Sequence, residues 1–114
     1  DKIRTHLNPE GVLVVALPNY NSTDAKRYGS GWAAYDTPRH LYHFTTESME
    51  KIASLCGFSI QSMHRMNFDS FYVSILSAKH MGKSFFSGIL NGFISWLSAK
   101  FNRKKCSSLI YIMK

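Results

Sequence analysis

The sequence predicts an α/β fold, in which strands and helices alternate along the chain. Residues 11–18, GVLVVALP, form a continuous apolar run that does not alternate with polar residues. Such a run is typical of a strand buried on both faces, as in a sheet flanked by helices. Apolar residues at helical spacing predict three helices, over 46–56, 70–81 and 84–101. Further apolar patterns predict strands over 58–66 and 107–113.

Each predicted helix has sequence signals at its ends. Thr45 or Thr46 can cap the first helix, and Gly57 follows its end. Asp69 can cap the second helix, and Gly82 ends it. Side chains spaced three and four apart mark one face of each helix. They are Met49, Ile52, Ala53 and Cys56 in the first helix, which are expected to pack, and Tyr72, Ile75, Leu76 and Lys79 in the second. In the third helix Phe86, Leu90, Phe93, Leu97 and Phe101 form a stripe that is expected to face the core.

Two segments lie outside these elements. Residues 1–7 have the pattern of the last turns of a helix, which Pro9 and Gly11 end. Since a domain rarely begins in this way, we expect further chain upstream of Asp1. Residues 19–37 are expected to form a long polar loop, and loops of this length are usually functional or mobile. The loop holds aromatic residues that suit a lid over a small ligand, namely Tyr20, Tyr28, Trp32 and Tyr35.

Composition and charge narrow the class of protein. The chain has 114 residues, 45 % of them apolar, which supports a packed core and argues against disorder. Its net charge of +7 suits contact with phosphates or an anionic surface. Alternatively, the chain is one half of a larger domain, whose positive and negative charges need not be equal in number within each half. Cys56 and Cys106 form no CxxC pair, which excludes a cysteine zinc site, and two free buried thiols are expected. No signal peptide is visible and the stretch 84–101 is too short and too polar to span a membrane, so a cytoplasmic location is expected.

Three motifs occur in the order that they have in one enzyme family. Leu7, Pro9 and Gly11 precede an apolar strand that ends in Pro-Asn. Residues 38–58 contain an RH…FT…L…GF pattern, and SSLIYIMK (107–114) closes the chain. Together these motifs resemble the C-terminal half of class I S-adenosylmethionine-dependent methyltransferases, in particular the bacterial small-molecule methyltransferase families. The similarity spans nearly the whole chain.

This resemblance implies the C-terminal part of a Rossmann-like sheet. The strands near 11–18, 58–66 and 107–113 would be neighbours, with 107–113 central and antiparallel. The family holds S-adenosylmethionine with a glycine-rich turn and an acidic residue of its N-terminal half, and GSG at 29–31 is no substitute because it follows no strand. We therefore expect a single partial domain over 1–114 that lacks the cofactor-binding half. Methyl transfer to a small-molecule or glycolipid-type acceptor is expected of the full-length protein, whereas this chain alone is expected to be inactive.

The resemblance places the acceptor pocket at the carboxyl ends of the strands. His40 is the candidate base, because the family's pattern retains a histidine after an arginine at this point. The candidate residues for binding the acceptor are Asn19, Trp32, Tyr35 and Arg39. Of these, Arg39 is suited to an anionic group of the acceptor.

Structural interpretations of the same residues stay open. Asn19 can be a turn residue, the aromatic residues can be loop packing, and His40 can be bonded to backbone. Arg39 can pair with Asp36 on the surface. A metal site of Asp36, His40 and His43 is disfavoured, because an extended segment does not bring these side chains together.

The helices between the last two strands, residues 69–101, suggest two further roles. We hypothesise that they cover the acceptor or mediate docking. The alternative function is a non-enzymatic basic module that docks on an anionic membrane or a protein partner through helix 84–101, next to the basic residues 103–105. A metal hydrolase built on the histidines is a third candidate. Self-association through the exposed edge of strand 11–18 is also left open, and no nucleic-acid partner is expected.

Overall fold

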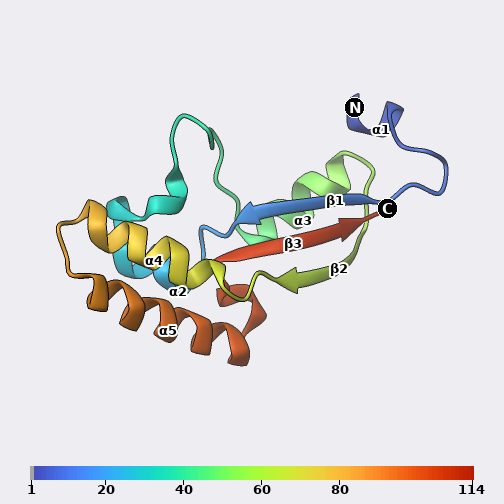
Figure 1. Cartoon of the computed structure of the whole chain (residues 1–114). Coiled ribbons are helices and arrows are strands. Elements are labelled where there is room, and N and C mark those ends of the chain that lie inside the picture. The colour runs from blue at the N-terminus through green and yellow to red at the C-terminus, as the bar shows by residue number, and fades with distance from the viewer. Residues whose placement is uncertain (1) are drawn as a thin grey trace.

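A three-stranded sheet forms the centre of the computed structural model, which describes residues 2–114 (Figure 1). Its strands are β1 (Leu13–Pro18), β2 (Ile60–Arg65) and β3 (Ser108–Met113), in the order β1-β3-β2. β3 is antiparallel to both neighbours, so that Tyr111 lies opposite Val15 on one side and Met63 on the other. The mixed α/β class and the central, antiparallel place of the last strand are therefore confirmed.

Five helices accompany the sheet within residues 2–114, and four of them were predicted, including the helical turns near the N-terminus. The helices are α1 (Lys2–Thr5), α2 (Thr23–Tyr28), α3 (Thr46–Leu55), α4 (Asp69–His80) and α5 (Phe85–Phe101). The prediction of an irregular loop over 19–37 was wrong, because α2 and two 3-10 turns, Gly29–Gly31 and Ala33–Tyr35, occupy much of it. Ser22 starts α2 by accepting a hydrogen bond from the Ala25 amide at 3.1 Å. None of the helices within residues 2–114 is long and apolar enough to cross a membrane.

One face of the sheet packs against α3. Met49 and Ala53 of this helix lie in a core with Leu109, Tyr111 and Met113 of β3. The hydroxyl of Thr45 accepts a hydrogen bond from the Ser48 amide at 3.2 Å and caps the helix, as predicted. The prediction that Ile52 and Cys56 face the core was wrong: both are exposed, because α3 presents only its Met49 and Ala53 side to the sheet.

The other face of the sheet is open within the described part of the chain. Val14 is 60 % exposed, and Ala16 is also exposed on the same face. Only the alternate residues of β1, Leu13, Val15 and Leu17, pack against the core. The expectation that this strand is buried on both faces is therefore not met, although its sequence is apolar on both sides.

α5 packs on α4 through its smallest residues. A Cβ atom on Gly88 would lie 2.6 Å from the Ile75 Cα, and one on Gly92 would lie 2.8 Å from the Phe71 Cα. The predicted core face of α5 was wrong, because close approach of the backbones requires small side chains between the two helices. The buried residues are Ser70, Val73, Ser74, Ser77 and Ala78 in α4 and Gly88, Gly92, Ser95 and Ala99 in α5. The bulky residues predicted for the core in α5 are exposed instead, namely Phe86, Leu90, Phe93, Leu97 and Phe101.

Candidate functional site

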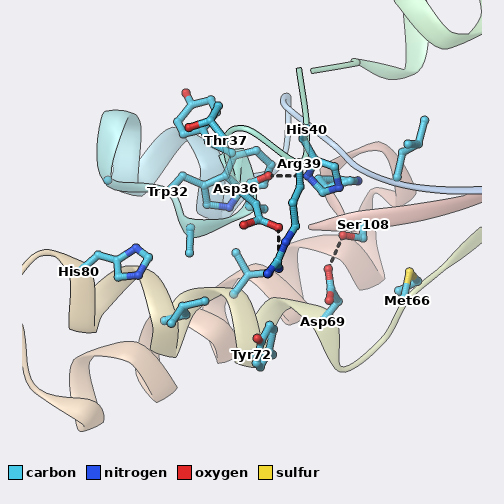
Figure 2. A pocket seen from close by; sticks show the side chains of 18 of the residues that line it. Trp32, Asp36, Thr37, Arg39, His40, Met66, Asp69, Tyr72, His80 and Ser108 are labelled. Carbon is cyan, nitrogen blue, oxygen red and sulfur yellow. Dashed lines mark hydrogen bonds and ion pairs between the residues drawn. The ribbon is translucent and has the colours of Figure 1, made fainter. Parts of the chain in front are cut away.

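A cavity of about 790 Å³ opens between the sheet, the 3-10 turns and α4 (Figure 2). Pro18 at the end of β1, Met66 just after β2 and Ser108 at the start of β3 all line it. The cavity therefore lies at the carboxyl ends of β1 and β2, which is where ligands bind in open α/β sheets. Its volume is in the range of small-molecule sites, about 300–1,000 Å³. α4 forms one wall of the cavity, through Asp69, Tyr72, Val73, Leu76 and His80.

Four of the five residues predicted for the site line this cavity. Trp32 lies between the two 3-10 turns, Tyr35 ends the second turn, and Arg39 and His40 follow it. Asn19 is not among the lining residues. It is buried, and its side-chain amide donates to the carbonyls of Lys104 at 2.8 Å and Cys106 at 2.9 Å. These contacts favour the structural interpretation of Asn19, and its role as an acceptor ligand stays a prediction.

The His40 ring is held by one hydrogen bond to the backbone. Its Nδ1 lies 3.2 Å from the Ala34 carbonyl oxygen. Because a carbonyl oxygen only accepts, Nδ1 carries the hydrogen, so that the lone pair of the neutral ring lies on Nε2. His40 thus fits both interpretations of the sequence, since the backbone bond orients the ring and leaves Nε2 able to act as a base.

His43 is held in a similar way but outside the cavity wall. Its Nε2 lies 3.0 Å from the Tyr35 carbonyl oxygen, and its ring stands edge-on to the Tyr35 ring at 5.0 Å. The residues described by the structure contain no group of three side chains able to hold a metal ion. His40 and His43 are bonded to different backbone carbonyls, those of Ala34 and Tyr35.

Arg39 is an exposed cation at the cavity. Its guanidinium lies 3.3 Å from the Asp36 carboxylate, and the Arg39 side chain is 82 % exposed. Exposed ion pairs contribute about 0–1 kcal/mol, so an anionic ligand can compete for this guanidinium at little cost. The predicted surface pair with Asp36 is present and does not exclude a binding role.

Asp69 lines the cavity, although the sequence predicted a different role for it. It was predicted to cap α4, but the cap position is Phe68, and the Asp69 carboxylate accepts a hydrogen bond from the Ser108 hydroxyl. Burial raises the pKa of Asp69, and the charge of Asp24 adds to this, while the Ser108 bond acts in the opposite direction. Figure 2 shows Asp69 on the α4 side of the cavity, with Arg39 and His40 on the other side. The sequence did contain a signal for this role of Asp69, because an acidic residue just after β2 lies at the ligand-binding end of a sheet.

The raised pKa of Asp69 has a consequence for stability. The folded state holds the proton more tightly than the unfolded state, so the contribution to the free energy of unfolding falls as pH rises from about 3.8 through the raised pKa. We expect Asp69→Asn to lose this dependence and to gain stability relative to the wild type as pH rises through that window. Urea unfolding across a pH series measures the difference, with Asp36→Asn as a surface control. A difference between Asp69→Asn and the wild type that stays constant with pH would contradict the assignment.

A second missed carboxylate lies behind the cavity wall. Asp24 of α2 is fully buried and accepts hydrogen bonds from the Trp32 indole at 2.8 Å, the Ser95 hydroxyl at 2.8 Å and the Ser107 hydroxyl at 2.7 Å. The bond to Trp32 fixes the indole that lines the cavity. The bonds to Ser95 and Ser107 tie that wall to α5 and to the segment before β3.

Two aromatic residues of the segment 19–37, Trp32 and Tyr35, form part of the cavity wall. Trp32 is buried and meets the Tyr35 ring edge-on at 5.4 Å. Tyr35 also contacts Tyr20, with ring centroids 6.1 Å apart, and burial together with this neighbour raises the Tyr35 pKa. Trp32 and Tyr35 therefore both pack against neighbouring residues and line the cavity.

Comparison with known proteins adds no assignment. No family model, curated protein or solved structure matches this chain. Function is therefore inferred from the cavity and from the motifs of the chain itself. The cavity wall combines one arginine, two histidines and two carboxyl groups, which offer hydrogen-bond donors and acceptors to a polar small molecule.

Proposed function

We propose that this chain is the acceptor-side, C-terminal portion of a Rossmann-like S-adenosylmethionine-dependent methyltransferase acting on a small-molecule or glycolipid-type acceptor. The observation that carries the proposal is the place of β3. The last strand of the chain lies between the first two and runs antiparallel to both. The family resemblance implies this arrangement, which three consecutive strands joined by short hairpins would not produce.

The open face and the free edge of β1 support the same proposal. Val14 and Ala16 are exposed although the strand is apolar throughout, and β1 pairs only with β3 among the described strands. An uncovered apolar edge strand favours association, so natural proteins usually cover it. In the proposed enzyme, the strands and helices of the cofactor-binding half cover both the edge and the face.

The described residues do not fit the cofactor itself. The GSG sequence forms a 3-10 turn directly after α2, so it does not follow a strand as a cofactor-binding turn must. The residues after β1 are engaged as well, because the Asn19 side chain is bonded to the backbone near β3. We therefore assign only the acceptor side of the reaction to this chain.

On the acceptor side, the residues of the cavity have separate roles. Arg39 binds an anionic group of the acceptor through its guanidinium. His40 takes a proton from the acceptor's hydroxyl or amine at Nε2, while the Ala34 carbonyl holds the ring in place. Asp69 and Ser108 offer a further hydrogen-bonding pair across the cavity. Holding the acceptor in one orientation is the main contribution that methyl transfer asks of this half.

The coding sequence upstream of Asp1 is the first test of the proposal. We expect it to encode a strand followed by a glycine-rich turn, with an acidic residue after the next strand. An upstream sequence without this pattern would overturn the methyltransferase assignment.

The second test measures methyl transfer by the full-length protein. The probe is S-adenosylmethionine with a labelled methyl group, offered with total lipid and small-molecule extracts of the source cells. We expect His40→Ala to lower kcat by about 100-fold or more, and Arg39→Ala mainly to raise the KM for an anionic acceptor. Leu41→Ala is the matched control, because Leu41 is exposed and does not line the cavity. Equal activity of His40→Ala and Leu41→Ala would remove His40 from the mechanism.

A further inference from the structure

The outer face of α5 carries bulky apolar residues where a soluble helix usually carries polar ones. Phe86 is 79 % and Phe101 is 86 % exposed, at opposite ends of the helix. Between them the same outer surface continues, with exposed Ile89, Leu90, Phe93 and Leu97. The inner side of the helix is lined by Gly88, Gly92, Ser95 and Ala99. Small residues between packed helices and bulky apolar residues outside are the arrangement of helices that face lipid.

The positive charge of the protein is concentrated in the same part of the chain. Residues 1–69 contain seven Lys and Arg and all seven Asp and Glu, so they are balanced. Residues 70–114 contain the other seven Lys and Arg and no acidic residue, so the whole net charge of +7 belongs to them. Two of these basic residues, Lys104 and Lys114, pair with glutamates of the first part of the chain. Lys83 and Lys100 lie beside the exposed apolar face of α5.

Two hollows border α5, and two basic side chains line each of them. One, of about 370 Å³, is lined by Arg65 and Lys100 together with aromatic rings, and the Lys100 Nζ lies 4.3 Å from the centre of the Trp96 ring. The other, of about 350 Å³, is lined by Arg27 and Lys83 and by the polar side chains of α5. Neither hollow has an acidic residue in its wall. The remaining lining residues are Asn67, Phe68, Phe71, Phe93 and Trp96 in the first and Tyr28, Ser87, Leu90 and Asn91 in the second.

We propose that α5 is an interfacial helix that docks this protein on an anionic lipid surface. The 17 residues of α5 form a rod of about 25 Å that lies in the plane of the membrane. Its outer apolar side chains enter the boundary between headgroups and acyl chains, and the two cationic hollows receive the lipid phosphates on either side. Figure 1 places α5 along the lower margin of the molecule with α4 above it, so that the outer face is free for such contact. This proposal stands independently of the methyltransferase assignment.

Co-sedimentation of the chain with vesicles tests the docking proposal. The probes are vesicles of phosphatidylcholine alone and of phosphatidylcholine mixed with phosphatidylglycerol. We expect the protein to bind the anionic vesicles, to bind less at high salt, and to bind the neutral vesicles weakly. Bound protein should also shift the Trp96 emission to the blue, because that indole lies in a cationic hollow beside the docking face.

Two double variants separate the apolar and the electrostatic contributions. Phe86→Ser with Leu90→Ser changes exposed residues only and is expected to weaken binding by at least about tenfold. Lys83→Gln with Lys100→Gln is expected to weaken binding by about tenfold at low salt and by less at high salt. Leu55→Ser with Lys51→Gln, on the exposed side of α3, is the matched control and should bind as the wild type does. Circular dichroism checks that each variant keeps its helices.

Three results would overturn the proposal. The first is no binding to anionic vesicles at low salt, and the second is unchanged binding by the Phe86→Ser, Leu90→Ser variant. The third is a homodimer in analytical ultracentrifugation that this variant dissociates, without vesicle binding by the wild type. That last result would assign the outer face of α5 to a second copy of the chain.

Discussion

Replacing Asp24 by alanine is expected to lower the free energy of unfolding by about 3 kcal/mol or more. The carboxylate is fully buried and is the acceptor for three buried donors, on Trp32, Ser95 and Ser107. Each donor left without a partner in the interior costs about 1–3 kcal/mol. Since domains of this size have about 5–15 kcal/mol in total, the variant should unfold at markedly lower urea concentration. Urea titration followed by far-ultraviolet circular dichroism measures the effect.

The control for Asp24 is the other carboxylate of the same region. Asp36 forms an exposed ion pair with Arg39, so Asp36→Ala is expected to cost less than about 1 kcal/mol. Asp24→Asn should fall between the two alanine variants, because its amide oxygen still accepts from at least one donor. Equal midpoints for Asp24→Ala and Asp36→Ala would show that the buried network does not stabilise the fold.

The main elements could be predicted because their signals are local. The apolar run before Pro18 and the helical spacing after Thr45 are complete within about ten residues, and both elements are found where expected. The helix within the segment between them was not predicted. Ser22 is a good cap, yet the α2 that it starts has only six residues and depends on burial of its Asp24.

The cavity was predictable in part for the same reason. The motif that carries the family resemblance contains Arg39 and His40, and both line the cavity. Asp24 was not predictable, since two of its donors, Ser95 and Ser107, lie 71 and 83 residues away in the sequence. Burial of a carboxylate depends on such distant partners, and no local pattern reports them.

The orientation of α5 shows why periodicity alone can mislead. Large apolar residues at spacings of three and four predict a core-facing stripe, but the smallest residues of the helix also recur at that spacing. Both stripes fit one face of a helix, and the pattern does not say which of them is buried. Close contact with α4 decides in favour of Gly88 and Gly92, because larger side chains would keep the two backbones apart.

The packing of α5 therefore predicts that replacing a small residue of this helix costs more stability than replacing a bulky one. Alanine in place of glycine normally stabilises a helix by up to about 1 kcal/mol. In Gly88→Ala the new Cβ would lie 2.6 Å from the Ile75 Cα, so the helices must move apart, and we expect a net loss of about 1–3 kcal/mol. Phe86→Ala removes far more volume, yet its side chain is largely exposed, and we expect a change within about 0.5 kcal/mol.

Urea unfolding of the Gly88→Ala and Phe86→Ala variants decides which face of α5 is buried. If the bulky stripe formed the core, Phe86→Ala would cost about 3–5 kcal/mol and Gly88→Ala would be neutral or stabilising. The opposite order follows from the packing of α5 on α4, and it also leaves the apolar outer face free without loss of stability. A helix that keeps its fold while exposing this face, in a segment with seven basic and no acidic residues, has a physical reason to bind an anionic lipid surface.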